Sequence, residues 1–158
     1  MIRKVFKLVG LLLLSIVMVA CGNTTNTSEI TVKNAWIRPG EIDGPPTVAY
    51  MEIQNTGDGT DRLLSISADF SNTLEVHETQ VTDGVARMVP QEDGIEIPIN
   101  ATVELKQGGL HVMIMALNED LIEGQNVELT LKFENAGEIV TVANISLDGM
   151  ITENEQSR

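Results

Sequence analysis

Two histidines and several methionines of this chain are spaced so that β-strands would place them on common faces. In the run GGLHVMIMAL (108–117), the side chains of His111, Met113 and Met115 fall at alternate positions. Side chains along a strand point alternately to opposite faces, so these three share one face. The other face is apolar and is expected to lie against the core: Leu110, Val112, Ile114 and Ala116. The segment is therefore predicted to separate packing residues from possible metal ligands.

The second histidine, His77, lies in a similar segment, LEVHETQV (74–81), on the side opposite the nearest apolar pair. The next residues, TDG (82–84), are typical of a tight turn between two strands. A hairpin through this turn would bring the run 85–90 beside the first strand. Met88 would then lie within a few residues of the level of His77.

Imidazole and thioether donors without a thiolate are a specific chemical combination. Thioether sulfur is a soft ligand that favours Cu(I), whereas zinc sites usually recruit cysteine, histidine and carboxylates. Cys21 is the only cysteine, so the chain has no internal disulfide and lacks the thiolate of a blue-copper electron carrier. Two histidines are also fewer than a copper oxidase would normally use. We therefore expect a protein that is not an enzyme, and the donor set allows Cu(I) binding without requiring it.

A second interpretation involves no metal. Methionine often fills irregular gaps in cores, so Met113 and Met115 could be packing residues, with both histidines at the surface. The chain would then be a structural or adhesive β-domain. The two hypotheses differ in geometry, because only a metal site requires His77, Met88 and His111 to converge.

Short β-branched and apolar runs recur about every ten residues, separated by Gly, Asn, Asp and Pro, and helical periodicity is nearly absent. This pattern predicts an all-β sandwich or barrel in one domain, residues 29–148. The expected strands are 29–38, 47–55, 61–68, 73–81, 85–90, 95–99, 101–106, 109–117, 126–134 and 138–146.

The N-terminus has the form of a bacterial lipoprotein signal. A cationic start and a short apolar run precede Ala20 and Cys21, which predicts a signal peptide at 1–20 and a lipidated Cys21. An uncleaved N-terminal anchor is the alternative. Residues 21–28 are polar and small, as in a flexible tether, and 149–158 form a polar tail. We expect an exported protein, lipid-anchored to the outer face of the cytoplasmic membrane or within the periplasm or cell envelope.

The formal net charge of −13 limits the partners of the chain. A surface of this sign repels nucleic acid and anionic lipid headgroups. Attachment to the membrane should therefore depend on the acyl chains at Cys21.

Several segments resemble the PCuAC-type periplasmic copper chaperones: AYMEIQNTGDGTDRLLSISAD, VHETQVTDGVARM, IEIPINATVELKQGGLHVMIMAL and VELTLKFENAGEIVTV. The resemblance covers roughly residues 30 to 146. It implies a cupredoxin-like Greek-key β-sandwich that binds one Cu(I) per chain. The residues that match the ligands of the family are His77, Met88, His111 and Met113.

The resemblance also implies a role. Such a protein would deliver copper by ligand exchange to a recipient, either a cytochrome oxidase subunit or a Sco-type protein. Copper storage or resistance without delivery is the alternative within the binding class. The tail offers only Met150 as a further soft donor, so one site is expected, and we expect a monomer.

Three residues near the four matched ligands have secondary roles. Met115 lies one strand step beyond Met113, roughly 7 Å along, and is an auxiliary ligand or a shield. Glu75 and Glu78 flank His77 and are expected to be solvated. The alternative is that they orient its ring through the second nitrogen, as carboxylates do for many metal-bound histidines.

Overall fold

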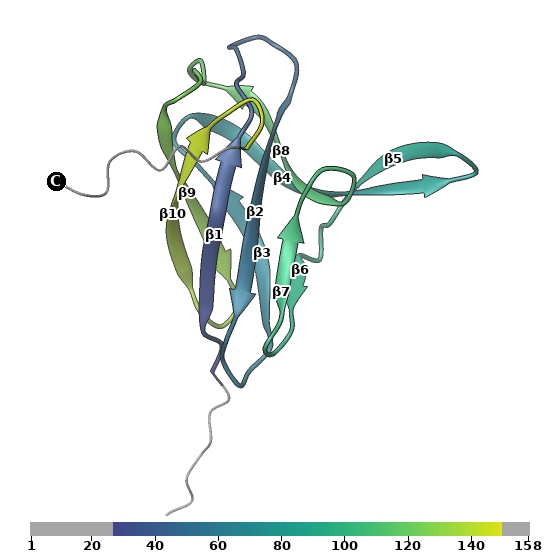
Figure 1. Cartoon of the computed structure of the whole chain (residues 1–158), viewed down its shortest axis with the longest axis vertical. Coiled ribbons are helices and arrows are strands. Elements are labelled where there is room, and N and C mark those ends of the chain that lie inside the picture. The colour runs from purple at the N-terminus through teal and green to yellow at the C-terminus, as the bar shows by residue number, and fades with distance from the viewer. Residues whose placement is uncertain (1–26, 150–158) are drawn as a thin grey trace, which may run out of the picture.

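The computed structural model describes residues 27–149 and places them in ten β-strands (Figure 1). The strands are β1 (Ile30–Ile37), β2 (Thr47–Asn55), β3 (Asp61–Ser67), β4 (Ser71–Thr82), β5 (Val85–Pro90), β6 (Ile95–Ile97), β7 (Thr102–Leu105), β8 (Leu110–Leu117), β9 (Asn126–Phe133) and β10 (Glu138–Ile145). Each strand lies where the sequence predicted one. Among the described residues there is no helix of the length and apolarity that a membrane crossing requires.

The strands pair in the order β5-β4-β8-β2-β1-β10-β9-β3-β6, with β7 beside β2. All pairs are antiparallel except β1 with β10. The sheet curls so that β3 comes back against β4, and the two layers enclose one core (Figure 1). The predicted all-β, cupredoxin-like sandwich is confirmed.

The apolar side of β8 packs into this core as predicted at Val112 and Ile114, both fully buried. The prediction for Ala116 was wrong, because this residue is exposed. Its backbone φ of 52° departs from strand geometry, which interrupts the alternation of faces before Leu117.

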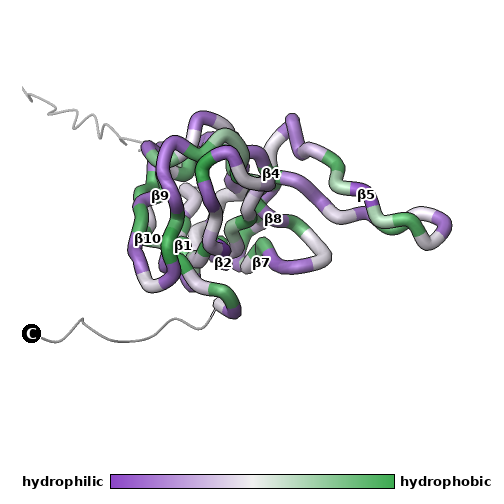
Figure 2. The backbone as a smooth tube through the Cα atoms, turned by 90° about the horizontal axis from the view of Figure 1, so that it is seen from above, coloured by the Kyte–Doolittle hydropathy of each residue, from purple (hydrophilic) through white to green (hydrophobic). Residues whose placement is uncertain are grey.

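A hairpin of β4 and β5 projects from the sandwich, and we call residues 78–90 the arm (Figures 1 and 2). β8 pairs with β4 only as far as Glu78, so beyond that point β4 has β5 as its single partner. Asp83 and Gly84 close the turn with φ of 53° and 77°. Two positive φ angles in a two-residue loop define the type I′ turn that suits a twisted hairpin. The arm therefore leaves β5 as an edge strand with exposed side chains.

The opposite end of the sandwich is closed around Asp61, which is 2% exposed. Ser28 donates its hydroxyl to this carboxylate, and Thr27 donates its backbone N–H to Asp58. The predicted signal peptide, Cys21, most of the predicted tether and the tail beyond Gly149 lie outside the described residues.

Candidate metal site

The structure brings the two histidines together as direct neighbours on β4 and β8. His77 is paired with His111 across the two strands, so both side chains point to the same face of the sheet. The ring centroids are 6.0 Å apart and the ring planes are inclined by 61°. His77 is 8% exposed and His111 is 4% exposed. The pair is therefore buried rather than displayed at the surface.

Each imidazole has one nitrogen fixed by a hydrogen bond and one nitrogen without a partner. The Nε2 atom of His77 lies 2.9 Å from a carboxylate oxygen of Glu75, and the Nδ1 atom of His111 lies 3.0 Å from the carbonyl oxygen of Gly109. Both partners accept, so in the neutral rings these nitrogens carry the hydrogen. Nδ1 of His77 and Nε2 of His111 are then left as buried lone pairs with no hydrogen-bond partner.

Buried polar atoms are nearly always hydrogen-bonded, so two unsatisfied nitrogens on facing rings need a physical explanation. A lone pair on neutral imidazole is a metal donor, and the hydrogen bond on the other nitrogen sets which donor is presented. Within residues 27–149, no three His, Cys, Asp or Glu side chains are grouped as a metal site would require. Further ligands for an ion at this pair would therefore have to be of another kind, such as thioethers.

Met88 and Met113 flank the histidine pair on the same face of the sheet. Met88 lies on β5 opposite Thr79, two residues along β4 from His77, and its side chain is 56% exposed. Met113 follows His111 by one strand step and is half-buried. One thioether is thus held in the sandwich, while the other is on the arm.

Met115 lies farther from the histidines than the other candidates. It is paired with Thr73, two strand steps beyond the level of His77. It lines a small recess that shares Glu41, Pro45 and Pro46 with the groove at His111. This position is consistent with a shielding role.

Of the two acids that the sequence placed beside His77, only Glu75 contacts its ring. Glu78 instead accepts a hydrogen bond from the side-chain amide of Gln80 at 2.9 Å. The two carboxylates lie on opposite faces of β4, because an even spacing from His77 keeps a side chain on its face and an odd spacing does not.

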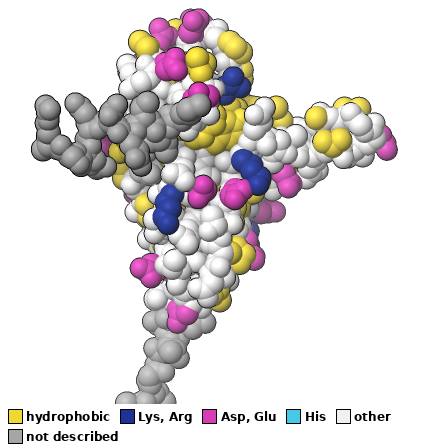
Figure 3. Space-filling view, in the orientation of Figure 1, with side chains coloured by type: hydrophobic (Ala, Val, Ile, Leu, Met, Phe, Trp, Pro, Cys, Tyr) yellow, Lys and Arg dark blue, Asp and Glu magenta, His cyan; other side chains and the backbone are white. Residues whose placement is uncertain are grey.

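An open groove of about 880 Å³ adjoins the histidine pair, in the angle between the arm and the top of the sandwich (Figure 3). Met88, His111, Tyr50 and Arg38 are among the residues that line it. Burial raises the pKa of Tyr50, and the nearby charge of Arg38 offsets part of this effect. The phenol is therefore neutral at physiological pH. No local sequence pattern predicts this groove, because the residues that line it come from segments far apart in the chain.

A family model described as "Putative lipoprotein LpqE-like" matches residues 30–145. The chain belongs to this family. A relative in Leifsonia xyli subsp. xyli, "Putative lipoprotein Lxx21020", is 31% identical over 106 residues. The match covers 67% of this chain and 63% of the relative.

Solved structures similar to this LpqE-like protein are PCuAC domains. The copper-bound PCuAC domain from PmoF2 has a TM-score of 0.62 at 24% identity, over 76% of this chain and 94% of that domain. The Cu(I) form of DR1885 from Deinococcus radiodurans has a TM-score of 0.56 at 23% identity, over 80% of this chain and 84% of that one. The predicted PCuAC-like family is thereby confirmed.

Proposed function

We propose that this LpqE-like protein is a Cu(I) metallochaperone whose cargo is held by His77, Met88, His111 and Met113. The observation that carries the proposal is the pair of buried imidazole nitrogens without hydrogen-bond partners. Two neutral nitrogens and two thioethers form a soft donor set suited to Cu(I). Copper in the similar PmoF2 domain and Cu(I) in DR1885 support this choice of ion.

The four donors differ in a way that suits release as well as binding. His77 and His111 are held in a paired region of the sheet and oriented by hydrogen bonds. Met88 is more than half exposed and lies on an edge strand of the arm. An incoming ligand would therefore displace Met88 first, while the histidines keep the ion bound. The ion then passes from one protein to the other without being free in solution.

The cellular setting is part of the same proposal. Cys21 would carry the lipid anchor of an exported protein, which fits the lipoprotein relatives. The recipient would be a copper-receiving protein of the same compartment, such as a cytochrome oxidase subunit or a Sco-type protein. One Cu(I) per monomer is expected from one set of donors.

The test is an anaerobic Cu(I) competition titration of the full chain in a mild detergent against a coloured chelator. We expect one equivalent to bind, and His77→Ala, His111→Ala, Met88→Leu and Met113→Leu each to weaken binding at least tenfold. Met→Leu conserves volume, so these variants should remain folded. Met115→Leu is the matched control, a methionine of the same face that should bind copper like the parent.

Three results would contradict the proposal. Equal affinity in the parent and in all four ligand variants would return the histidines to a structural role. An effect of Met115→Leu as large as that of Met113→Leu would place the ion farther along β8 than proposed. Tight binding without transfer to any acceptor would instead favour storage.

A further inference from the structure

The two faces of the arm differ in chemistry. Residues on the His77 face are paired so that Val81 faces Ala86 and Thr79 faces Met88. On this face Val81 is 69% exposed and Met88 is 56% exposed. The charged residues of the two arm strands, Glu78 and Arg87, belong to the other face by the same alternation. The arm therefore presents an uncovered apolar stripe that begins at the proposed copper ligand.

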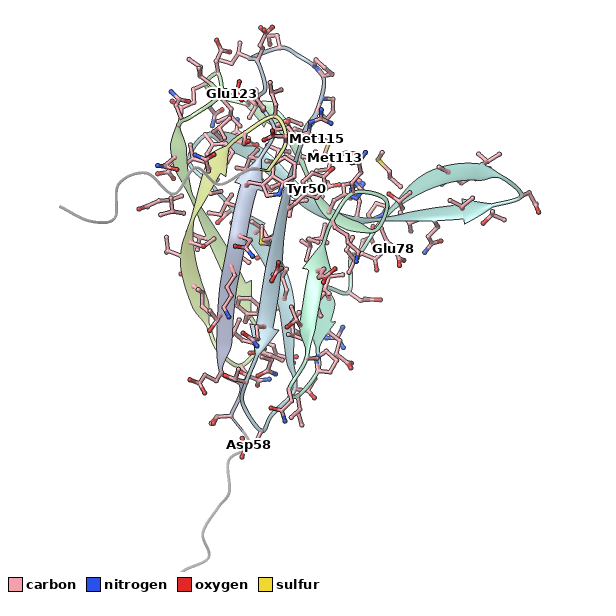
Figure 4. The ribbon with its side chains drawn as sticks, in the orientation of Figure 1. Tyr50, Asp58, Glu78, Met113, Met115 and Glu123 are labelled. Atoms are coloured by element: carbon pink, nitrogen blue, oxygen red, sulfur yellow. The ribbon has the colours of Figure 1, made fainter. Side chains whose placement is uncertain are left out.

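The groove beside this stripe is lined by acidic side chains. Glu41, Asp120 and Glu123 line it, and Arg38 is the one cationic side chain among its lining residues. Glu123 lies at the top of the sandwich, above Met113, while the arm extends to the side (Figure 4). The groove is thus lined both by the thioether donor Met88 and by a set of carboxylates.

We propose that this stripe and groove are the docking surface for the copper recipient. The proposed occupant is a polypeptide segment with copper ligands in its centre. Apolar side chains lie on one side of these ligands and Lys or Arg side chains on the other. The apolar side chains would cover Val81 and Met88, and the cations would meet Glu41 and Glu123. This inference rests on the proposed function, since it assigns the partner chemistry of the same site.

Three properties of the surface support this occupant. The groove is continuous with the proposed site, because His111 and Met88 are among the residues that line it. Its charge is opposite to that of a basic segment, and a charged surface speeds the encounter with an oppositely charged partner. Covering an exposed apolar stripe beside the ion removes water from the point where ligands are exchanged.

The test measures copper transfer from the Cu(I)-loaded full chain in non-ionic detergent to synthetic acceptor peptides. Each peptide has two cysteines, flanked by Leu and Lys, by Leu and Glu, or by Ser and Lys. Stopped-flow absorbance of the thiolate–copper product gives the transfer rate. At low ionic strength we expect the Leu/Lys peptide to react about tenfold faster than the Leu/Glu peptide. At roughly 0.5 M salt this difference should fall to within about twofold.

Variants separate the two parts of the surface. Val81→Ser should slow transfer to the Leu/Lys peptide several-fold, whereas Val85→Ser, on the opposite face of the same hairpin, should not. Glu41→Gln with Glu123→Gln should remove most of the preference for lysine. A charge-matched control pair is available on β9 and β10, in Glu128→Gln with Glu138→Gln, which do not line the groove.

Three outcomes would overturn this inference. They are equal rates for the lysine and glutamate peptides, equal slowing by Val81→Ser and Val85→Ser, or a concentration-dependent dimer in sedimentation that Val81→Ser dissociates. The last would make the stripe an interface between two copies of this chain. Equilibrium Cu(I) affinity, measured on the same samples, separates these outcomes from failure of the proposed function, in which copper would not bind at all.

Discussion

A buried ionisable side chain lies at one end of the sandwich and a pair of them at the other. The carboxylate of Asp61 has hydrogen-bond donors for both oxygens, whereas each ring of the histidine pair has a nitrogen without a partner. The carboxylate of Asp61 accepts hydrogen bonds from the Ser28 hydroxyl and from the backbone N–H groups of Arg62, Asn135 and Ala136, over 2.5 to 2.9 Å. The histidine pair at the other end leaves one buried nitrogen on each ring unpaired.

This difference distinguishes a structural polar cluster from a ligand-binding one. A satisfied buried carboxylate ties several segments together and stabilises the fold. Unsatisfied buried donors or acceptors cost about 1–3 kcal/mol each, so a fold keeps them where another benefit compensates. For His77 and His111 the proposed benefit is copper binding.

The largest expected effect on stability comes from removing the hydrogen-bonded carboxylate of Asp61. Asp61→Ala leaves three backbone N–H groups without their acceptor and should lower the free energy of unfolding by about 2–4 kcal/mol. Copper affinity should not change, because the residue lies at the far end of the sandwich. Urea unfolding followed by Trp36 fluorescence measures the loss, and Asp58→Ala, which removes one exposed hydrogen bond, is the control.

The same variant has a pH dependence of defined sign. Burial alone raises the pKa of Asp61, but its four hydrogen bonds outweigh burial and hold the pKa below the ordinary value. A lowered folded-state pKa contributes stability that is complete above the unfolded pKa, about 3.9, and is lost as pH falls through the folded value. The stability difference between parent and Asp61→Ala should therefore be constant from pH 5 to 7 and narrow below about pH 4. A stability difference between the parent and Asp61→Ala that increased in acid would contradict this account.

Most of the fold was predictable from local sequence, because β-branched runs and Gly- or Asp-containing turns specify strands and hairpins without reference to the rest of the chain. The alternation of faces also identified His111 and Met113. Ala116 was misassigned because its positive φ breaks that alternation. The burial of the histidine pair depends on the β4–β8 register, and the groove joins Arg38 and Glu41 of the β1–β2 loop to Glu123 of the β8–β9 loop. Neither feature has a local sequence signal.

A substitution of Glu75 should have a smaller effect than that of Asp61, and the effect should be on copper binding at the histidine end. Glu75→Ala removes the acceptor that fixes the hydrogen on Nε2 of His77. Cu(I) affinity should fall about 10- to 100-fold, or about 1.4–2.7 kcal/mol, as for other residues that orient metal-bound histidines. Nitrogen NMR of the apo imidazole should show the Nε2–H tautomer in the parent and a mixture in the variant. Glu78→Ala, which contacts Gln80 instead, should match the parent in both measurements.

The smallest effect is also the most direct test of the comparison between the two ends. His111→Phe removes one unsatisfied buried nitrogen, and the carbonyl of Gly109 keeps a donor in the backbone N–H of Thr79. Without copper, the variant should be about 1 kcal/mol more stable than the parent, since an unsatisfied polar atom is replaced by an apolar ring. With Cu(I) in excess the order should reverse, because only the parent gains the free energy of binding. If His111→Phe destabilised the protein equally with and without copper, the histidine would be a structural residue like Asp61.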